Sequence, residues 1–248
     1  MNFFAIKRVD ELLKLGTKRP FCHVQELVEF SELSARVKSG DIKRIVLYVR
    51  HSERPPIEVD DPTFGANLGL TDYGVELCHE VGKALRGIPD LRAYASPARR
   101  TILTAEEILS SYDSIIPLVE ESKEISLAGL YTANSKTLHN SYFTRGSAVV
   151  NDAYNNGEAV AGYVPRDDAA LAMFNYLTGP ELGGNLLMVS HDVFIAAFMS
   201  SLSNNSFGIN TKDWVGFIQG AALTLEFDGW HMYRVVLNKE NAHSIFIQ

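Results

Sequence analysis

Three mainly apolar runs stand out along the chain, and each is predicted to be a buried β-strand. They cover residues 45–49, 91–95 and 186–189 and are rich in aliphatic, β-branched and aromatic side chains. Between them, apolar residues recur at helical spacing, as over 75–85, where Thr71 is expected to cap the helix. Strands that alternate with helices are typical of an α/β protein with a largely parallel sheet flanked by helices on both faces.

Weaker patterns predict the other parts of the chain. Apolar residues at helical spacing, Val9 to Leu13 and Leu27 to Val37, indicate that residues 1–40 form a helical extension packed on a main domain of residues 41–248. Within that domain, the polar and poorly periodic stretch of about 119–165 is expected to be an insertion or lid.

Two further strand predictions concern the ends of the sheet. A short strand is expected at 115–118. Apolar and polar residues alternate on both sides of Asp228-Gly229, which is typical of a hairpin with a two-residue turn, expected at an edge of the sheet.

Composition narrows the class of protein. A net charge of −7 without any run of Lys and Arg argues against general binding to nucleic acid or to a membrane surface. No apolar stretch approaches the roughly 20 residues of a membrane helix, and no signal peptide is visible, so a cytoplasmic location is expected. Cys22 and Cys78 are too few for a disulfide framework or a zinc site and are expected to be buried. A homo-oligomer is left open.

Charged and polar residues follow each of the three strands. The three strand ends read Arg50-His51-Ser52-Glu53-Arg54, Ser96-Pro97-Ala98-Arg99-Arg100-Thr101 and Ser190-His191-Asp192. Parallel strands bring their carboxyl ends to one edge of a sheet, so these side chains are predicted to lie together. The helix that starts after Pro97 is expected to present Arg99 or Arg100 in its first turn.

The chemistry of these residues points to an anion. An imidazole between two guanidiniums is a poor general base, because nearby positive charge disfavours its protonation. The same surroundings suit a neutral nucleophile directed at a bound anion, and we predict that the anion is a phosphoryl group.

The ordered set of motifs resembles the histidine phosphatase superfamily, also called the phosphoglycerate mutase-like fold. The resemblance covers about residues 44–237 and rests on the three strand ends together with Leu70-Thr71-Asp72-Tyr73-Gly74. It implies that His51 is the nucleophile and that the phosphate is bound by Arg50, Arg54, Arg99 and His191. Ser52 departs from the usual Arg-His-Gly pattern and loses the conformational freedom of Gly.

Two features resemble one branch of that family, the acid phosphatases and phytases: Arg54-Pro55 after the nucleophile and Asp192 after the second histidine. The chain is shorter than most members of that branch and has neither a disulfide set nor a signal peptide. An extracellular acid phosphatase is therefore not expected.

The resemblance implies hydrolysis of a phosphate monoester through a phosphohistidine on His51. Asp192 is the first candidate for the proton donor and Glu124 the alternative, with Glu53 and Glu121 less favoured. No metal or other cofactor is expected, because cationic side chains already supply the charge that Mg²⁺ would.

The expected partner is a small phosphorylated substrate, and the segment around Asp213-Trp214 and the loop after Pro56 are expected to shape its site. Two alternatives stay open, a phosphoglycerate-type phosphomutase and a non-catalytic module that binds a phosphorylated ligand.

Overall fold

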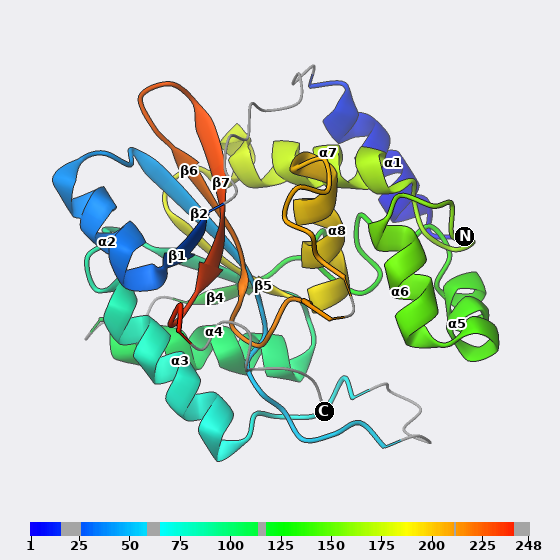
Figure 1. Ribbon diagram of the computed structural model, residues 1–248, viewed down its shortest axis with the longest axis horizontal. Coiled ribbons are helices and arrows are strands. Elements are labelled where there is room, and N and C mark those ends of the chain that lie inside the picture. The colour runs from blue at the N-terminus through cyan, green and yellow to red at the C-terminus, as the bar shows by residue number, and fades with distance from the viewer. Residues whose placement is uncertain (16–25, 59–64, 114–117, 211, 241–248) are drawn as a thin grey trace.

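The computed structural model describes residues 1–15, 26–58, 65–113, 118–210 and 212–240 (Figure 1). Some of the expectations above lie outside these described residues. They are the burial of Cys22, residues 115–117 of the strand expected at 115–118, and residues 59–64 of the loop expected near the substrate.

The described part of the chain forms seven strands and eight α-helices in an α/β arrangement. The strands are β1 (Leu27–Glu29), β2 (Arg44–Arg50), β3 (Arg92–Ala95), β4 (Val119–Glu121), β5 (Leu186–Ser190), β6 (Gly220–Leu225) and β7 (Trp230–Val236). The helices are α1 (Phe3–Leu13), α2 (Phe30–Ser39), α3 (Asp72–Leu85), α4 (Arg99–Tyr112), α5 (Ser135–Arg145), α6 (Ser147–Asn155), α7 (Arg166–Thr178) and α8 (Asp192–Leu202), and a 3₁₀ turn follows α7 at Pro180–Leu182.

All the strands belong to one mostly parallel sheet with the order β1-β7-β6-β2-β5-β3-β4. Only β6 runs against its neighbours, antiparallel to both β2 and β7. In the parallel register Arg50 lies beside Ser190, and Ala95 lies beside Val189. The carboxyl ends of β2, β3 and β5 therefore meet at one edge of the sheet, as the sequence predicted.

Helices cover both faces of this sheet, because successive side chains of a buried strand point to opposite sides. Val46 and Tyr48 of β2 pack in a core with residues of α1, α7 and α8. Ile45, Leu47 and Val49 pack in a second core with residues of α2, α3 and α4. Figure 1 shows these two helical layers on either side of the strands. Each fully buried aliphatic side chain stabilises this sandwich by roughly 1.5–3 kcal/mol.

Two predictions about the sheet are wrong. Leu27 was expected on a helix but lies on β1, which pairs in parallel with β7 through Leu27 and Arg234. The hairpin of β6 and β7 forms, but Leu225 pairs with Trp230, so four residues and not the predicted two separate the strands. The hairpin is also interior, because β1 and not β7 occupies the edge. A strand of three residues is too short for its period to be recognised, and its pairing partner is far away in the sequence.

The expected insertion contains more regular structure than its composition indicates. β4 lies at its start, and helices α5 and α6 follow. An antiparallel bridge joins Thr132, just before α5, to Tyr163, after α6. At the N-terminus, the Asn175 side-chain amide of α7 donates a hydrogen bond to the Leu12 carbonyl (2.9 Å), which ties α1 to the helical layer. The division into residues 1–40 and 41–248 and the role of a lid stay predictions. No helix in the described ranges is both long and apolar enough to cross a membrane.

Candidate active site

The carboxyl end of β2 holds the central pair, Arg50 and His51. The Arg50 backbone N–H donates to the Gln219 carbonyl (2.9 Å) and the His51 N–H donates to the Ser190 carbonyl (3.0 Å). Both side chains are buried, His51 to 3% exposure. These backbone hydrogen bonds to the segments on the two sides of β2 fix the position of the His51 backbone, and with it the position of the imidazole.

The hydrogen bond of His51 defines its tautomer. Nδ1 lies 2.7 Å from the Ser52 carbonyl oxygen, which can only accept, so Nδ1 carries the proton and Nε2 keeps its lone pair. Burial, followed by the positive charge of Arg50 and the proximity of His191, holds the pKa of His51 well below its usual 6.5, although the Ser52 carbonyl acts in the opposite direction. His51 is therefore a neutral imidazole with a nucleophilic nitrogen.

A second neutral imidazole, His191, faces the first, with ring centroids 5.7 Å apart. Its Nδ1 lies 3.2 Å from Nη2 of Arg100, and because a guanidinium only donates, Nδ1 accepts. Nε2 then carries the proton and donates to Oγ of Ser96 at 2.9 Å. Burial and the Arg100 charge lower the pKa of His191 to about 3.

Arg100, and not Arg99, is the arginine that α4 brings to this site. The Arg100 side chain is 4% exposed and its Nη1 donates to the Gly65 carbonyl (2.8 Å). Burial, then the neighbouring charge of Arg54, lowers the pKa of Arg100 to about 10. Arg99 is exposed, and its guanidinium points to the Asn67 carbonyl at 3.4 Å. The structure thus places Arg100 beside His191 and leaves Arg99, the arginine expected at the phosphate, outside the site, because the first turn of α4 directs the two side chains apart. That Arg100 binds the phosphate in place of Arg99 is a proposal.

A signal for Arg100 was present in the sequence. The buried positions of α4 are spaced by three and four residues: Arg100, Thr101, Thr104, Ala105, Ile108 and Leu109. Steps of four residues back from Ile108 lead to Thr104 and then to Arg100, which therefore lies on the buried face of the helix. Arg99 lies outside this series. No comparable pattern marks Ser96, the partner of His191.

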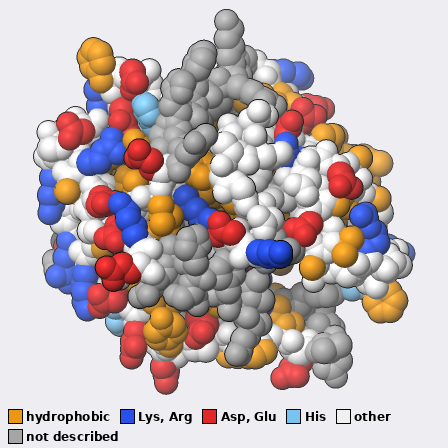
Figure 2. Space-filling model, in the orientation of Figure 1, with side chains coloured by type: hydrophobic (Ala, Val, Ile, Leu, Met, Phe, Trp, Pro, Cys, Tyr) orange, Lys and Arg blue, Asp and Glu red, His pale blue; other side chains and the backbone are white. Residues whose placement is uncertain are grey.

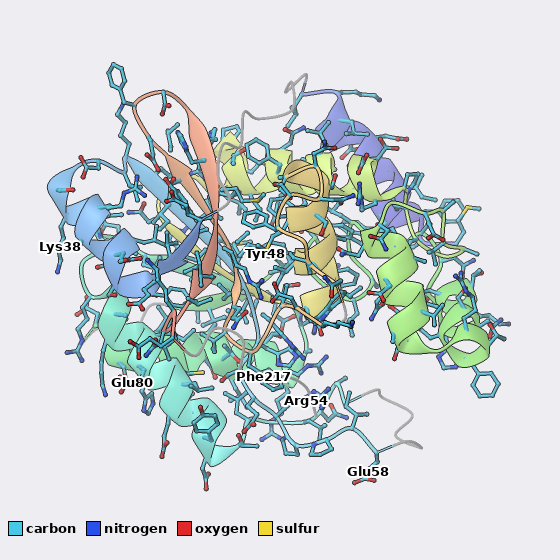
Figure 3. All side chains as sticks on the ribbon, in the orientation of Figure 1. Lys38, Tyr48, Arg54, Glu58, Glu80 and Phe217 are labelled. Atoms are coloured by element: carbon cyan, nitrogen blue, oxygen red, sulfur yellow. The ribbon has the colours of Figure 1, made fainter. Side chains whose placement is uncertain are left out.

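We name Arg50, His51, Arg54, Arg100, His191 and Asp192 the His51 cluster. Its three arginines each have a buried Nε that lacks a hydrogen-bond partner among the described residues. An unpaired buried donor costs free energy, roughly 1–3 kcal/mol, that a bound anion would recover. Burial, and then the charge of Arg50, lowers the pKa of Arg54. Figure 3 shows Tyr48 inside the fold and Arg54 with Phe217 toward the end of the sheet where β2 finishes.

The carboxylate of the cluster, Asp192, is the first residue of α8. Its Oδ2 accepts a hydrogen bond from the Trp214 indole N–H (3.0 Å) and lies 3.3 Å from Nη2 of Arg50. Burial by itself would raise the pKa of Asp192, but the Arg50 charge, the Trp214 bond and His191 together lower it. Asp192 is therefore ionised at neutral pH in the free protein.

The structure does not bring the candidate glutamates to the His51 cluster. Glu124 is ion-paired with Nε of Arg8 on α1 (3.3 Å) and accepts from the Ser122 hydroxyl. Glu53 accepts a hydrogen bond from the Thr71 hydroxyl, and Glu121 is exposed. Of the carboxyl groups predicted as proton donors, only Asp192 has a described hydrogen bond or ion pair with another member of the cluster.

The loop after His51 is held by the start of α3. Ser52 donates from its hydroxyl to the Gly74 carbonyl (2.7 Å) and from its backbone to the Thr104 hydroxyl (2.9 Å). Ser52 does not have a positive φ, so this position does not need the conformational freedom of Gly. A Cβ on Gly74 would lie 2.3 Å from the Glu53 carbonyl oxygen, so helix and loop touch through backbone atoms.

Changing Gly74 to Ala is expected to destabilise the protein by about 1–3 kcal/mol, because backbone must move to admit the methyl group. The measurement is thermal unfolding followed by circular dichroism. Gly183→Ala is the matched control, since its Cβ would have no neighbour nearer than 4.0 Å. Equal melting temperatures for the Gly74 and Gly183 variants would contradict the close approach.

The positive charge of the cluster contrasts with the negative net charge of the chain. Figure 2 shows acidic and basic side chains interspersed over the visible face. The chain as a whole carries a net charge of −7. Its guanidiniums at the carboxyl edge of the sheet are thus a local exception, which favours a small anionic ligand at that edge.

Comparisons with known proteins agree with this arrangement. The model of the histidine phosphatase superfamily (branch 1) matches residues 46–233. No curated protein sequence matches the chain significantly. The match leaves open the features that resemble the acid-phosphatase branch, Arg54-Pro55 and Asp192, which stay a prediction.

Solved structures share the fold at low sequence identity. A mycobacterial glucosyl-3-phosphoglycerate phosphatase is 15% identical, with 77% of this chain and 96% of that chain covered and a TM-score of 0.50. A phosphoglycerate mutase from Bacillus anthracis str. Sterne is 16% identical, with 79% of this chain and 95% of that chain covered and a TM-score of 0.51. A mycobacterial hydrolase is 17% identical, with 79% of this chain and 90% of that chain covered and a TM-score of 0.51. With the family model matching most of its length and these structures sharing its fold, the chain belongs to the histidine phosphatase superfamily.

Proposed function

We propose that this protein hydrolyses a phosphate monoester, with His51 as the nucleophile. The observation that carries the proposal is the state of His51, a buried neutral imidazole whose Nε2 keeps its lone pair among three guanidiniums. Membership of a family that contains phosphatases supports it. The substrate belongs to the class of small phosphorylated metabolites.

The reaction has two displacements at phosphorus. In the first, the lone pair of His51 Nε2 forms a bond to phosphorus while the bond from phosphorus to the ester oxygen breaks, and the alcohol leaves with a proton. In the second, water attacks the phosphohistidine, and phosphate leaves with the nitrogen regaining its lone pair. Arg50, Arg54 and Arg100 bind the equatorial oxygens in both steps.

The magnitudes are consistent with this set of residues. Phosphate monoesters are among the slowest substrates to react without a catalyst, so the barrier must fall by on the order of 20 kcal/mol. About four to five charge-assisted hydrogen bonds contribute roughly 1.5–3 kcal/mol each. Orientation of the nucleophile against the phosphoryl group contributes about 7–11 kcal/mol more. No single proton donor in the cluster is required to supply most of the effect.

The proton for the leaving group needs a source, because Asp192 is ionised in the free protein. A phosphate monoester binds a second proton with a pKa of about 6, so its monoanion can carry one into the site. There the dianionic phosphoryl group competes for Arg50, which weakens the pairing that stabilises the Asp192 carboxylate. We propose that Asp192 accepts the proton of the substrate monoanion and delivers it to the leaving oxygen.

This route predicts an unusual pH profile. As the pH rises above about 6, kcat/KM should fall tenfold per unit, since the monoanion disappears. As the pH falls below 6.5, activity should persist, because burial and the charge of Arg50 lower the pKa of the nucleophile His51 well below that value and its neutral form remains. The measurement is kcat/KM from pH 4 to pH 9. An acid limb near 6.5 would show an unperturbed His51 and contradict the prediction.

The two candidate donors can be separated by leaving group. Asp192→Asn should lower kcat/KM about 10²-fold or more for an alkyl phosphate and less than about tenfold for p-nitrophenyl phosphate, whose leaving group needs no proton. Glu124→Gln should change neither by more than about threefold, because Glu124 is occupied by Arg8. The reverse pattern would make Glu124 the donor.

A chemical test addresses the function itself. Rapid quenching of the protein with a ³²P-labelled phosphate monoester, chosen by screening a panel of phosphorylated metabolites, should trap a phosphoenzyme that is labile to acid and stable to alkali. Binding of phosphorylated ligands with no turnover and no trapped phosphoenzyme would instead indicate a non-catalytic module. Release of a rearranged phosphoglycerate in place of inorganic phosphate would indicate a phosphomutase.

A further inference from the structure

A segment between α8 and β6, residues 213–219, crosses the carboxyl end of β2 and contacts both members of the Arg50 and Asp192 ion pair. We call it the strap. Its Val215 carbonyl accepts a hydrogen bond from Nη1 of Arg50 (2.8 Å). Its Trp214 indole N–H donates to Asp192. The strap thus determines where one guanidinium and the carboxylate of the His51 cluster point.

The strap also supplies an aromatic surface beneath the cluster. The centroid of the Phe217 ring lies 4.3 Å from the guanidinium carbon of Arg50 and 5.8 Å from the centroid of the His51 ring. The next residue, Ile218, has a φ of +62°, a left-handed conformation that is strained for a β-branched residue. A segment in such a conformation persists only where its surroundings hold it.

One buried arginine of β7 holds the strap. Nη1 of Arg234 donates to both carboxylate oxygens of Asp213 (3.0 and 2.9 Å). Nη2 donates to the Trp214 carbonyl (2.9 Å) and to Oε1 of Gln219 (3.1 Å). The same Oε1 accepts from the Gly216 backbone N–H (3.3 Å), so a single guanidinium ties the start, the middle and the end of the strap.

We propose that Arg234 is a positioning residue for the phosphate site. It fixes the strap, and through the strap it orients the guanidinium of Arg50 and the carboxylate of Asp192. None of the described hydrogen bonds or ion pairs of Arg234 reaches the His51 cluster directly. The planar fork of an arginine is required, because one point charge cannot serve a carboxylate, a carbonyl and an amide at fixed angles. The proposal rests on the proposed function, since the bound anion is taken to be phosphate.

The test compares Arg234→Met with its parent in a Trp230→Phe background, where Trp214 is the remaining tryptophan. Calorimetry with inorganic phosphate should give a Kd about 10-fold to 100-fold higher in the variant, as for other residues that orient a binding group. With p-nitrophenyl phosphate, kcat/KM should fall by a similar factor. In the absence of phosphate, Trp214 emission should shift to longer wavelength, which a role in stability alone would not cause in a folded variant.

Two further variants make the result decisive. Arg36→Met is the matched control, because Arg36 is ion-paired with Glu226 (2.7 Å) and packs over the Tyr233 ring of β7, but has no described contact with the strap. It should leave phosphate affinity and Trp214 emission unchanged. Asp213→Asn removes the negative charge of the ion pair between Arg234 and Asp213. It should raise the phosphate Kd and shift Trp214 emission to longer wavelength, each less than Arg234→Met does. This variant keeps the test possible if Arg234→Met does not fold.

Two results would overturn the proposal. One is an unchanged phosphate Kd together with unchanged Trp214 emission in the Arg234 variant. The other is an equal loss of phosphate affinity in the Arg36 control, which would indicate general destabilisation. A parent that neither binds phosphate nor turns over any ester would overturn the proposed function. The emission of the ligand-free variants would then still decide whether Arg234 fixes the strap.

Discussion

Changing His51 to alanine should lower kcat for a phosphate monoester by on the order of 10⁴-fold to 10⁶-fold, as removal of a nucleophile does in other enzymes that use covalent catalysis. The reason is structural as well as chemical. Among the described residues of the cluster, His51 is the one whose ring nitrogen has a lone pair that is not engaged: Nε2 is opposite the Nδ1 that donates to Ser52, whereas Nδ1 of His191 accepts from Arg100. No neighbouring side chain can replace it in forming the bond to phosphorus.

The measurement is the initial rate with p-nitrophenyl phosphate together with phosphoenzyme trapping. His79→Ala is the matched control, because His79 of α3 is hydrogen-bonded to Glu107 of α4 (2.9 Å) and has no described contact with the cluster. It should change neither the initial rate nor the trapped phosphoenzyme. Retention of the trapped phosphoenzyme in His51→Ala would assign the nucleophile to another residue. His191→Ala would then be the next variant to test.

Changing Arg100 to methionine should lower kcat/KM by about 10²-fold to 10³-fold, the usual effect of removing one donor that stabilises the charge of a transition state. Arg100 acts in two ways. Its guanidinium adds positive charge to the anion site, and its bond to Nδ1 keeps His191 in the tautomer whose Nε2 donates to Ser96. Both contributions disappear together in the variant.

Arg99 provides the contrast. Arg99→Met should stay within about threefold of the wild-type kcat/KM, because this neighbouring side chain is exposed and bonds to the Asn67 carbonyl. Arg100→Lys keeps the charge and should recover part of the activity. Thermal unfolding of each variant checks that the protein folds. If Arg99→Met were the more damaging change, Arg99 would be the residue that contacts phosphate.

Several features of the fold were predictable because they depend on local sequence. The apolar runs that became β2, β3 and β5 are continuous and followed by polar or charged residues, so their type was recognisable and their ends were predicted to within one residue. The N-cap of α3 at Thr71 was likewise visible, and its hydroxyl accepts from the Gly74 backbone N–H. Parallel pairing then required that Arg50, His51 and His191 share an edge.

Other features depended on partners that are remote in the chain. β1 is recognisable only by its pairing with β7, and helices α5 and α6 form in a stretch whose composition indicates irregular structure. The strap is similar, because its conformation is held by Arg234, which lies in a strand that the sequence marked only as part of a hairpin. In each case contacts of long sequence separation override weak local preferences.

The sequence by itself determined the chemical inventory of the site and the edge of the sheet at which it gathers. Two histidines, three arginines and an aspartate follow three strands, and strand direction alone brings them together. Only the tertiary structure decided that Arg100 rather than Arg99 enters the cluster, since adjacent residues of a helix face different ways and packing selects the buried one. It also decided that His51 is neutral and Asp192 ionised, because a pKa depends on burial and on the distances to other charges, and these exist only in the folded chain.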